Sequence, residues 1–568
     1  MRAAARLRRL RLACWLSAGA LGALQAFAYR DDMNPDGVSY LDLADAWRRG
    51  DWAQAVSLYW SPLYSWLLGG ALALLRPPAR AEFPVVHLVN LLLYVAALGS
   101  LEFFVRSSAP RPAGGAEAAP PEAVRVAWGY ALFAVAALEL VGLRLATPDL
   151  IVLAVLLMTA GLLCRLADAR GGGGAAVALG ALLGLGYLAK AVLLPVALLA
   201  LALVAVAAGR ARPVWPRVAL ALTAFALVAV PWIAAMSSMA GRPTLGENAR
   251  LNYLWLVTRE YQAPLLAYPG ARPAAWRLEH PPRPLLGAPA TFELAGASGG
   301  TLPIWYDPAA WHRGAPVRFD PMAQIRAVAR NVRAGGRLGL RLLPLLVGAA
   351  VLLALLGVRR ERAWLRREGV LLTLGVAPLA GYALIHVEGR YVAGPIVVLG
   401  VALLGLLRPA GAEGRRLIGA VCACVIPLQL VPLAVDTAYH AAWVARRPAG
   451  ERAAAAEPWR AAEGLAALGV RPGDPVAAAG DYFQAGWARL ARVRIVAVVD
   501  RHEPLDCLLT EACRARVVEA LQPTGARALV VAGLPHAVAA AQGWVRLGDS
   551  EHWAWRLQEE RGRGRPSR

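Results

Sequence analysis

The stretch "GLGYLAKAVLLPVALLALALV", residues Gly184–Val204, decides the class of fold to which this chain belongs. One charged residue, Lys190, interrupts a run that is otherwise strongly apolar, and Lys190 is the only lysine in the sequence. Comparable apolar runs recur along the 568 residues, of which 58% are hydrophobic and 17% are charged. A helix of about 20 apolar residues crosses the hydrocarbon layer of a bilayer. The sequence therefore predicts an all-α polytopic membrane protein.

About eleven segments are expected to be transmembrane helices. The first follows a basic flank and resembles a signal peptide, but no A-x-A-like cleavage site follows it. We therefore expect an uncleaved helix and a cytoplasmic N-terminus. Leu58–Leu75 is a short apolar segment that either spans the membrane or lies in its interface. The predicted spans are 12–29, 83–105, 124–143, 150–166, 174–189, 193–209, 217–236, 339–358, 369–386, 392–407 and 416–435.

The distribution of arginines indicates whether the short segment spans. Basic residues prefer cytoplasmic loops, and five loops are cytoplasmic if the segment does not span. The short turns on the other side then hold only Arg144, Lys190 and Arg390 as basic residues. Arg76 and Arg80 mildly favour the opposite assignment. We adopt the non-spanning interpretation, with the C-terminus outside. The arginines that support it are Arg106, Arg111, Arg165, Arg170, Arg210, Arg212, Arg217, Arg359, Arg360, Arg362, Arg366, Arg367, Arg408, Arg415 and Arg416.

Two domains are predicted, a transmembrane domain over 1–435 and a soluble extracytoplasmic domain over 436–568. The transmembrane domain contains a first outer loop of about 30–82 and a large outer loop of about 237–338. In the tail, short β-rich runs alternate with helical stretches, which predicts a small α/β domain. Cys507 and Cys513 lie six residues apart in this tail and form either a disulfide or two free thiols.

The net charge of +22 has a simple explanation in a membrane protein. Arginines gather in cytoplasmic loops and beside anionic headgroups, so we expect membrane lipids as partners and no nucleic acid. His280, His312 and Asp307 do not have the spacing of a metal site. We therefore expect no metal ligands and no other cofactor, although a divalent metal is not excluded.

The first outer loop, "RDDMNPDGVSYLDLADAWRRGDW", is rich in aspartate. Its apolar residues recur at helical spacing, so a helix is expected along the membrane surface. Asp42, Asp45 and Asp51 are expected on the solvated face of that helix. Asp36 lies in the turn "NPDG" before it, where it is either an ordinary turn residue or a catalytic carboxylate at the mouth of a cavity.

Ionisable residues also lie at the outer ends of three other predicted spans. Asp149 begins a span, where it either caps the helix with Thr147 or adds a second acid to a site. Lys190 and Arg390 depart from the arginine distribution, either because they reach outer headgroups or because they bind an anionic group in a cavity. A phosphate fits two such cations. His386, Glu388 and Tyr391 share the short turn of Arg390.

The large outer loop contains "HPPRPLLGAPATFELAGASGGTLPIWYDPAAWHRG", which is rich in proline, glycine and aromatic residues. This composition is typical of a loop that stacks on sugars or closes over a site, and equally of a structural loop. His280 and Arg283 are the candidates for substrate contacts in it.

Five motifs occur in order: "DGVSYL" from Asp36, "SPLY" from Ser61, "TPD" from Thr147, "GYLAK" from Gly186 and "EGRY" from Glu388. Together they resemble the GT-C superfamily of membrane glycosyltransferases. The nearest members are family 39-like relatives of the protein O-mannosyltransferases and the lipid A aminoarabinose transferases. The resemblance covers roughly 12–410 and leaves out the tail beyond about 440. The family usually has Asp-Glu where this chain has Asp36–Gly37, and commonly Pro-Pro where it has Ser61–Pro62.

The resemblance implies a GT-C fold and inverting transfer of a sugar from a polyprenyl-phosphate donor to a hydroxyl. The acceptor would be a lipid, a glycan or a protein. It further implies an inner, plasma-membrane location with the site facing the periplasm or exterior. Asp36 matches the family's general base, and Lys190 and Arg390 would bind the donor phosphate. The residues expected to bind or orient substrate are Tyr40, Tyr64, Asp149, His280, Arg283, Glu388 and Tyr391.

A transporter or flippase of lipid-linked glycans is the main alternative. That class predicts ionisable residues deep within spans and helices broken at mid-membrane. Here the ionisable residues gather at one predicted surface beside large loops, which favours an enzyme. A non-catalytic scaffold is the third hypothesis.

Overall fold

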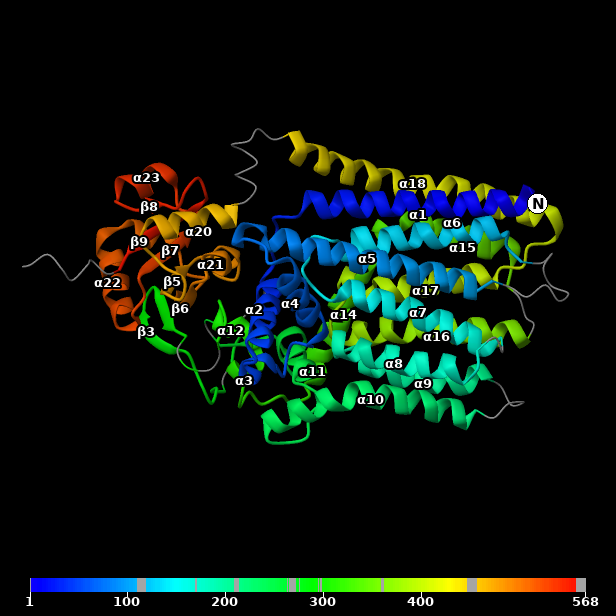
Figure 1. Ribbon diagram of the computed structural model, residues 1–568, viewed down its shortest axis with the longest axis horizontal. Coiled ribbons are helices and arrows are strands. Elements are labelled where there is room, and N and C mark those ends of the chain that lie inside the picture. The colour runs from blue at the N-terminus through cyan, green and yellow to red at the C-terminus, as the bar shows by residue number, and fades with distance from the viewer. Residues whose placement is uncertain are drawn as a thin grey trace, which may run out of the picture.

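The computed structural model describes residues 2–109, 119–168, 171–208, 214–262, 264, 272–274, 276–294, 296, 299–358, 362–446 and 457–557, without the side chains of 3, 272 and 362–366. Six of the arginines named for the loops lie outside this part of the chain: Arg111, Arg170, Arg210, Arg212, Arg359 and Arg360. The molecule is elongated, with a helical bundle at one end and an α/β domain at the other (Figure 1). The N-terminus lies at the end of the bundle far from the α/β domain (Figure 1).

Each predicted span contains a helix of the bundle. The helices are α1 (Arg2–Ala28), α5 (Glu82–Ser107), α6 (Glu122–Ala134), α7 (Asp149–Ala167), α8 (Gly173–Ala189), α9 (Leu193–Ala208), α10 (Trp215–Ala240), α15 (Leu343–Leu356), α16 (Arg362–Ile385), α17 (Gly389–Leu406) and α18 (Gly411–Arg446). In the described residues, eight helices are long and apolar enough to span a membrane. Helices α8 and α9 are shorter, and α15 forms a bent pair with α14 (Pro321–Arg341). The class of fold is confirmed, and the count of eleven spans stays a prediction.

The first outer loop remains at one end of the bundle. It contains α2 (Pro35–Arg49), α3 (Trp52–Ala55) and α4 (Leu63–Leu75). At about 1.5 Å per residue, α4 is about 20 Å long, less than the roughly 30 Å of hydrocarbon that a span crosses. His87 Nε2, near the start of α5, lies 2.8 Å from the carbonyl oxygen of Asp32, just after α1. Because α1 ends where α5 begins, the geometry agrees with the non-spanning interpretation.

A seven-stranded sheet forms the core of the α/β domain. Its order is β3 (Arg283–Gly287), β4 (Ala290–Glu293), β6 (Arg494–Val499), β5 (Pro475–Ala479), β7 (Ala528–Ala532), β9 (His552–Arg556) and β8 (Val545–Arg546). The neighbours β6, β5 and β7 are parallel, and the helices that accompany the sheet are α20 (Glu457–Ala467), α21 (Gly486–Ala491), α22 (Glu511–Leu521) and α23 (His536–Ala541).

The sheet is built from two distant parts of the sequence. Strands β3 and β4 form a hairpin in the large outer loop, and β4 pairs with β6 of the tail. Helix α18 continues to Arg446, past the boundary predicted at residue 435. Cys507 and Cys513 form a disulfide with their Cα atoms 5.7 Å apart, which selects one of the two alternatives left by the sequence.

A buried ion cluster joins the α/β domain to the bundle. The guanidinium of Arg489 on α21 contacts Asp42 at 2.8 Å, Asp45 at 2.7 Å and Glu82 at 2.6 Å. Arg492 also pairs with Glu82. The expectation that Asp42 and Asp45 lie on a solvated helix face is therefore wrong, because the tail covers that face of α2. Asp51 is exposed and accepts a hydrogen bond from Gln54 N at the start of α3.

Candidate active site

A polar cavity of about 350 Å³ lies where the bundle meets the outer loops. Its walls come from α2, from the turns before α7, α9 and α17, and from the large loop. The lining residues are Asp36, Tyr40, Tyr59, Trp60, Ser61, Thr147, Pro148, Lys190, Ala191, Asn248, Asn252, Leu256, Trp305, His386, Glu388, Arg390 and Tyr391.

Asp36 lies in the first turn of α2, slightly inside the helix rather than in the turn before it. Asn34 is the N-cap residue, and its Oδ1 accepts a hydrogen bond of 2.7 Å from Ala146 N. Gly37 follows, and a Cβ atom at this position would lie 2.6 Å from the Cβ of Ala146. The close approach of α2 to the loop before α7 therefore leaves no room for a side chain at position 37.

Asp149 begins α7 at the end of a loop that neighbouring helices hold in place. Asn90 of α5 donates hydrogen bonds to the carbonyl oxygens of Leu143 and Leu145. Thr147 Oγ1 donates to Asp149 Oδ2 at 2.9 Å, whereas the N-cap residue of α7 is Pro148 and no side chain caps the helix. The side chain of Asp149 is only 1% exposed, and its charge is balanced by two cations of the cavity rather than by water.

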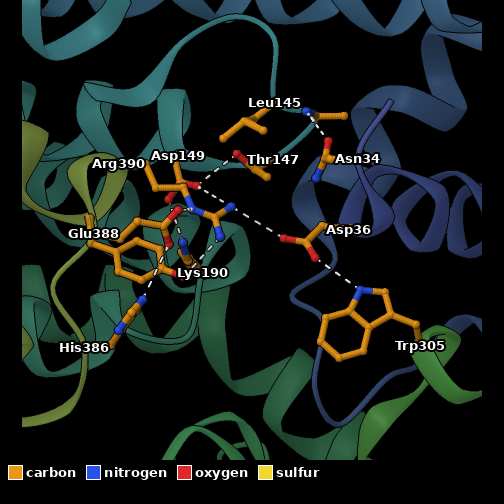
Figure 2. Close-up of polar contacts among 12 residues, drawn as sticks. Asn34, Asp36, Leu145, Thr147, Asp149, Lys190, Trp305, His386, Glu388 and Arg390 are labelled. Carbon is orange, nitrogen blue, oxygen red and sulfur yellow. Dashed lines mark hydrogen bonds and ion pairs between the residues drawn. The ribbon is translucent and has the colours of Figure 1, made fainter. Parts of the chain in front are cut away.

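Lys190 occupies the break between α8 and α9, where its backbone is extended. Its Nζ donates to Asp149 Oδ1 at 2.6 Å (Figure 2). The same nitrogen lies 4.2 Å from the centroid of the Tyr391 ring. An ammonium is compact enough to sit between a carboxylate and an aromatic face. The single lysine thus points into the cavity, and the alternative of reaching outer headgroups does not describe its contacts.

Arg390 is the centre of the charged wall. Its guanidinium lies 3.5 Å from Asp36, 3.6 Å from Asp149 and 3.0 Å from Glu388 (Figure 2). Three carboxylates therefore share two cations, so the charged wall is nearly balanced. An anionic ligand that contacts Lys190 and Arg390 has to compete with these carboxylates.

His386 lies at the edge of the same wall, between α16 and α17. Its Nε2 is 4.0 Å from Glu388 Oε2. Burial lowers the pKa of His386, although the nearby Glu388 opposes the shift. The imidazole is consequently neutral near pH 7 and can donate or accept a hydrogen bond.

Aromatic side chains form the facing wall. Trp305 Nε1 donates to Asp36 Oδ1 at 3.2 Å, and the Trp305 carbonyl accepts from Ser39 Oγ and Trp60 Nε1 (Figure 2 shows the first contact). Tyr40 packs edge-on against Trp60 at 5.1 Å. Phe483 of the α/β domain packs edge-on against Trp305 at 5.7 Å. A cavity with one charged and one aromatic wall suits a ligand that joins an anionic group to a sugar ring.

Six of the ten predicted site residues line the cavity, and four do not. Asp36, Lys190, Arg390, Glu388, Tyr40 and Tyr391 line it, and Asp149 lies directly behind them. Tyr64 is fully buried, donates to Asn90 Oδ1 at 2.7 Å and supports the ring of Tyr40. His280 precedes β3 of the α/β sheet. Arg283 is the first residue of β3 and pairs with Glu293.

Sequence reasoning missed several lining residues. Tyr59 and Trp60 precede the "SPLY" motif, and Trp305 lies in "LPIWYDP", where an aromatic cluster was the available signal. Asn248 and Asn252 belong to the short helix α11 (Asn248–Asn252), which carries no motif. Among the described residues, no group of three or more His, Cys, Asp or Glu side chains is placed to hold a metal ion. Independence from metal stays a prediction.

The fold of this chain is similar to that of solved membrane-protein structures. The crystal structure of ArnT from Cupriavidus metallidurans bound to undecaprenyl phosphate matches with a TM-score of 0.54 and 12% identity, over 97% of this chain and 98% of that chain. This chain has the ArnT fold. The resemblance to GT-C glycosyltransferases is therefore confirmed at the level of the fold. No protein-family model matches the chain, and no curated protein sequence matches it.

The likeness to ArnT extends through the tail, because it covers 97% of the chain. The expectation that the resemblance ends near residue 440 is wrong for the fold. ArnT in the apo state matches with a TM-score of 0.48 and 13% identity, over 95% of this chain and 97% of that chain. The oligosaccharyltransferase of Archaeoglobus fulgidus, in a complex with zinc and sulfate, matches with a TM-score of 0.46 and 10% identity, over 91% of this chain and 68% of that chain.

Proposed function

We propose that this protein transfers a sugar from a polyprenyl-phosphate donor to an acceptor hydroxyl, with inversion at the anomeric carbon. The observation that carries the proposal is the meeting of Asp36 with Lys190 and Arg390 in one cavity. These side chains come from three distant parts of a chain with the ArnT fold. ArnT is the protein whose crystal structure contains undecaprenyl phosphate, a ligand of the chemistry that this cavity suits.

The carboxylate of Asp36 acts as the general base. It accepts the proton of the acceptor hydroxyl while the hydroxyl oxygen forms a bond to the anomeric carbon. The bond between that carbon and the phosphate oxygen breaks on the opposite face, and polyprenyl phosphate leaves with the electron pair. The indole N–H of Trp305 orients the carboxylate through the 3.2 Å contact with Oδ1. Such a base contributes roughly 10²–10⁴-fold to the rate.

Lys190 and Arg390 stabilise the departing phosphate. The phosphodiester of the donor gains negative charge as it becomes a phosphate monoester, and preorganised cations stabilise that charge most where it develops. Arg390 offers a planar fork and Lys190 a compact point charge. Asp149 holds both cations at 2.6 and 3.6 Å, which keeps them in place before the donor arrives.

The cavity faces the periplasm or exterior in this proposal. It lies at the end of the bundle where Asp149 begins α7, and Arg106 and Arg165 lie near the opposite ends of α5 and α7. Basic residues at the far end are what the preference for cytoplasmic arginines requires. The ionisable residues of the cavity come from helix ends and turns, which supports an enzyme over a transporter.

Donor consumption by purified protein tests the proposal. Full-length protein in nanodiscs is incubated with a panel of polyprenyl-phospho-sugars and candidate acceptors, and released polyprenyl phosphate is measured. We expect one donor to be consumed, and Asp36→Asn to lower kcat by about 10²–10⁴-fold. Asp31→Asn is the matched control, because Asp31 precedes the same helix and pairs with Arg30 at 3.6 Å outside the cavity.

Two results would contradict the proposal. Equal rates for Asp36→Asn and Asp31→Asn would exclude Asp36 as the base. Movement of intact lipid-linked glycan across sealed vesicles, with no release of polyprenyl phosphate from any donor, would favour a transporter.

A further inference from the structure

Helix α14 runs across the direction of the bundle at the edge of the cavity. The break at Leu342 bends α14 by 87° from α15, which lies in the predicted span 339–358. A helix perpendicular to a span lies close to the plane of the membrane. Figure 1 shows α14 where the bundle meets the outer loops.

The residues of α14 fall on three faces. Ala323, Ala327 and Asn331 recur every four residues and are buried against the protein. Asn331 ties this face to the end of α16, because its side chain donates to the Ala383 carbonyl at 3.0 Å and accepts from Val387 N at 3.3 Å. This contact places α14 beside the turn that carries His386 and Glu388.

The second face is apolar and exposed. Ile325 is 61% exposed and Leu340 is 68% exposed, and Met322 and Val332 are similar. Phe319, just before the helix, is 71% exposed. A row of large apolar side chains of this length is unfavourable in water and favourable in the acyl region of a bilayer.

The third face is a stripe of five arginines. Their spacing of four, three, four and four residues keeps them on one side of a helix, next to the apolar row. Helix α14 contains no acidic residue. The members of the arginine stripe are Arg326, Arg330, Arg333, Arg337 and Arg341.

Most of the stripe is free to bind something outside the protein. Arg326, Arg333 and Arg337 are exposed, and within the part of the chain that the structure describes their side chains make no ion pair with a carboxylate. Arg330 donates to the carbonyl of Leu256 at 2.9 Å, and Leu256 lines the cavity. The contact of Arg330 therefore places the stripe beside the cavity wall.

We infer that α14 is a docking surface for anionic phospholipid headgroups at the membrane interface. Its apolar row enters the acyl boundary, and the arginine stripe contacts lipid phosphates. Charge complementarity favours anionic lipid as the occupant. The arginine stripe contains no acidic residue and lies beside the exposed apolar row, so it matches an anionic headgroup better than a zwitterionic one. Bound lipid would then cover α14 next to the cavity. The inference concerns lipid binding alone and stands whether or not the proposed transfer reaction is correct.

Lipid titration of the full-length protein tests the inference. Purified protein is titrated with phosphatidylglycerol or phosphatidylcholine, and bound lipid is counted by native mass spectrometry. The variant Arg326→Gln/Arg333→Gln/Arg337→Gln removes three charges from the stripe. We expect it to lose about tenfold or more in apparent affinity for phosphatidylglycerol and little for phosphatidylcholine.

The control is the variant Arg277→Gln/Arg471→Gln/Arg556→Gln, which removes the same charge from exposed positions outside α14. We expect it to bind phosphatidylglycerol as the wild type does. Equal phosphatidylglycerol binding by the stripe variant and the control would overturn the inference, as would equal affinity of the wild type for the two lipids.

A measurement on the wild type covers the case in which the stripe variant does not fold. Raising the salt concentration from about 0.05 M to 0.5 M shortens the screening length severalfold, so the preference for phosphatidylglycerol is expected to fall by about tenfold. A preference that does not change with salt would exclude an electrostatic docking surface and leave α14 as a contact for acyl chains or for a protein.

Discussion

Lys190 places its Nζ between two groups of the cavity wall. One side is the buried carboxylate of Asp149 at 2.6 Å, and the other is the face of Tyr391 at 4.2 Å. The lysine supplies positive charge at a point, whereas the longer planar group of an arginine requires a wider opening. All the other Lys or Arg positions in this chain are arginine, and the single lysine lies between a carboxylate and an aromatic face.

Replacing Lys190 is expected to reduce turnover more than binding. Lys190→Met should lower kcat for donor consumption by about 10²-fold, since it removes a charge that stabilises the leaving phosphate. Lys190→Arg should recover less than about a tenth of the kcat that Lys190→Met loses, because a guanidinium is larger than an ammonium. Arg144→Met is the control, as Arg144 is a basic residue of the same bundle end that lies outside the cavity lining. Equal kcat for Lys190→Met and Arg144→Met would show that the ammonium has no role in the reaction.

Trp305 is expected to position the general base. Trp305→Phe keeps a ring in place and removes the N–H that contacts Asp36. A hydrogen bond to a charged group is worth about 1.5–3 kcal/mol, so kcat should fall by about tenfold or more while KM for the donor changes little. Trp311→Phe is the matched control, because it removes a similar 2.7 Å hydrogen bond to Pro303 in the same segment. A fall in kcat that is the same in both variants would indicate a general effect on the loop.

The residues that could be found from the sequence are marked there by an unusual charge or by a motif. Lys190 and Arg390 are charges at the ends of spans, where membrane proteins seldom have them, and Asp36 begins a motif that resembles a known family. Trp305 and Asn252 are of types common in any outer loop, so nothing in the sequence separates them from structural residues. His280 was assigned by its loop alone, and the loop is long enough to reach a different part of the molecule.

At the scale of elements, α2 connects two sites. Its first turn carries Asp36, and its middle carries Asp42 and Asp45, which bind Arg489 of the α/β domain. Asp42 also accepts hydrogen bonds from Thr301 N and Oγ1. Any displacement of α21 therefore acts on the helix that positions Asp36.

Removing the central arginine of this cluster is expected to be strongly destabilising. Arg489→Gln leaves the buried carboxylates of Asp42 and Glu82 and the partly buried Asp45 without their shared cation, which should lower the free energy of unfolding by about 3–5 kcal/mol. The change would appear as a lower apparent melting temperature in detergent. Asp549→Asn breaks the pair of Arg460 with a 78% exposed carboxylate and should change the melting temperature little. Similar melting temperatures for the two variants would argue against a buried cluster.

The carboxyl group of Asp307, two residues after Trp305, should make the stability of the folded protein depend on pH. Asp307 begins α13 (Pro308–Trp311), and burial raises the pKa of its carboxyl to about 6, against hydrogen bonds from Ala309 N and Ser57 that lower it. The folded protein then binds a proton more tightly than the unfolded chain. The resulting stabilisation is complete below about pH 4 and is lost as the pH rises through about 6.

Asp307→Asn should remove this contribution, because asparagine resembles the neutral form of the acid. The apparent melting temperature of the variant should exceed that of the wild type more at pH 7.5 than at pH 5. If the melting temperatures of the variant and the wild type change in parallel between pH 5 and pH 7.5, the carboxyl of Asp307 is not protonated in the folded protein near pH 5.

At the scale of the whole molecule, the α/β domain and the bundle are joined by buried contacts. The ion cluster and the contact of Phe483 with Trp305 both connect the tail to the cavity. A chain truncated after Arg446 should therefore fail to give monodisperse protein in detergent, since Asp42 and Glu82 lose their partners. Adding Asp42→Asn and Glu82→Gln to the truncated chain should partly restore it. No improvement on neutralising these acids would show that the tail contributes by packing instead.

The parts of the fold that depend on neighbouring residues in the sequence were predictable. Apolar runs predicted each helix of the bundle, and the arginine pattern favoured a segment over Leu58–Leu75 that does not span. The seven-stranded sheet was not predictable as a whole, because the hairpin of β3 and β4 pairs with a strand about 200 residues later. The ion cluster was missed for the same reason, since Asp42 and Arg489 are joined only by tertiary structure.

The pairing of Thr291 in β4 with Val499 in β6 has a consequence for biogenesis. Ribosomes add about 5–20 residues per second, so the hairpin waits for roughly 10–40 s before its neighbour has been synthesised. During that interval the edge of β4 that will meet β6 is unpaired, while several later helices enter the membrane. A newly made chain should therefore be most vulnerable to proteases in the loop around β3 and β4, and should become resistant only when synthesis has nearly finished.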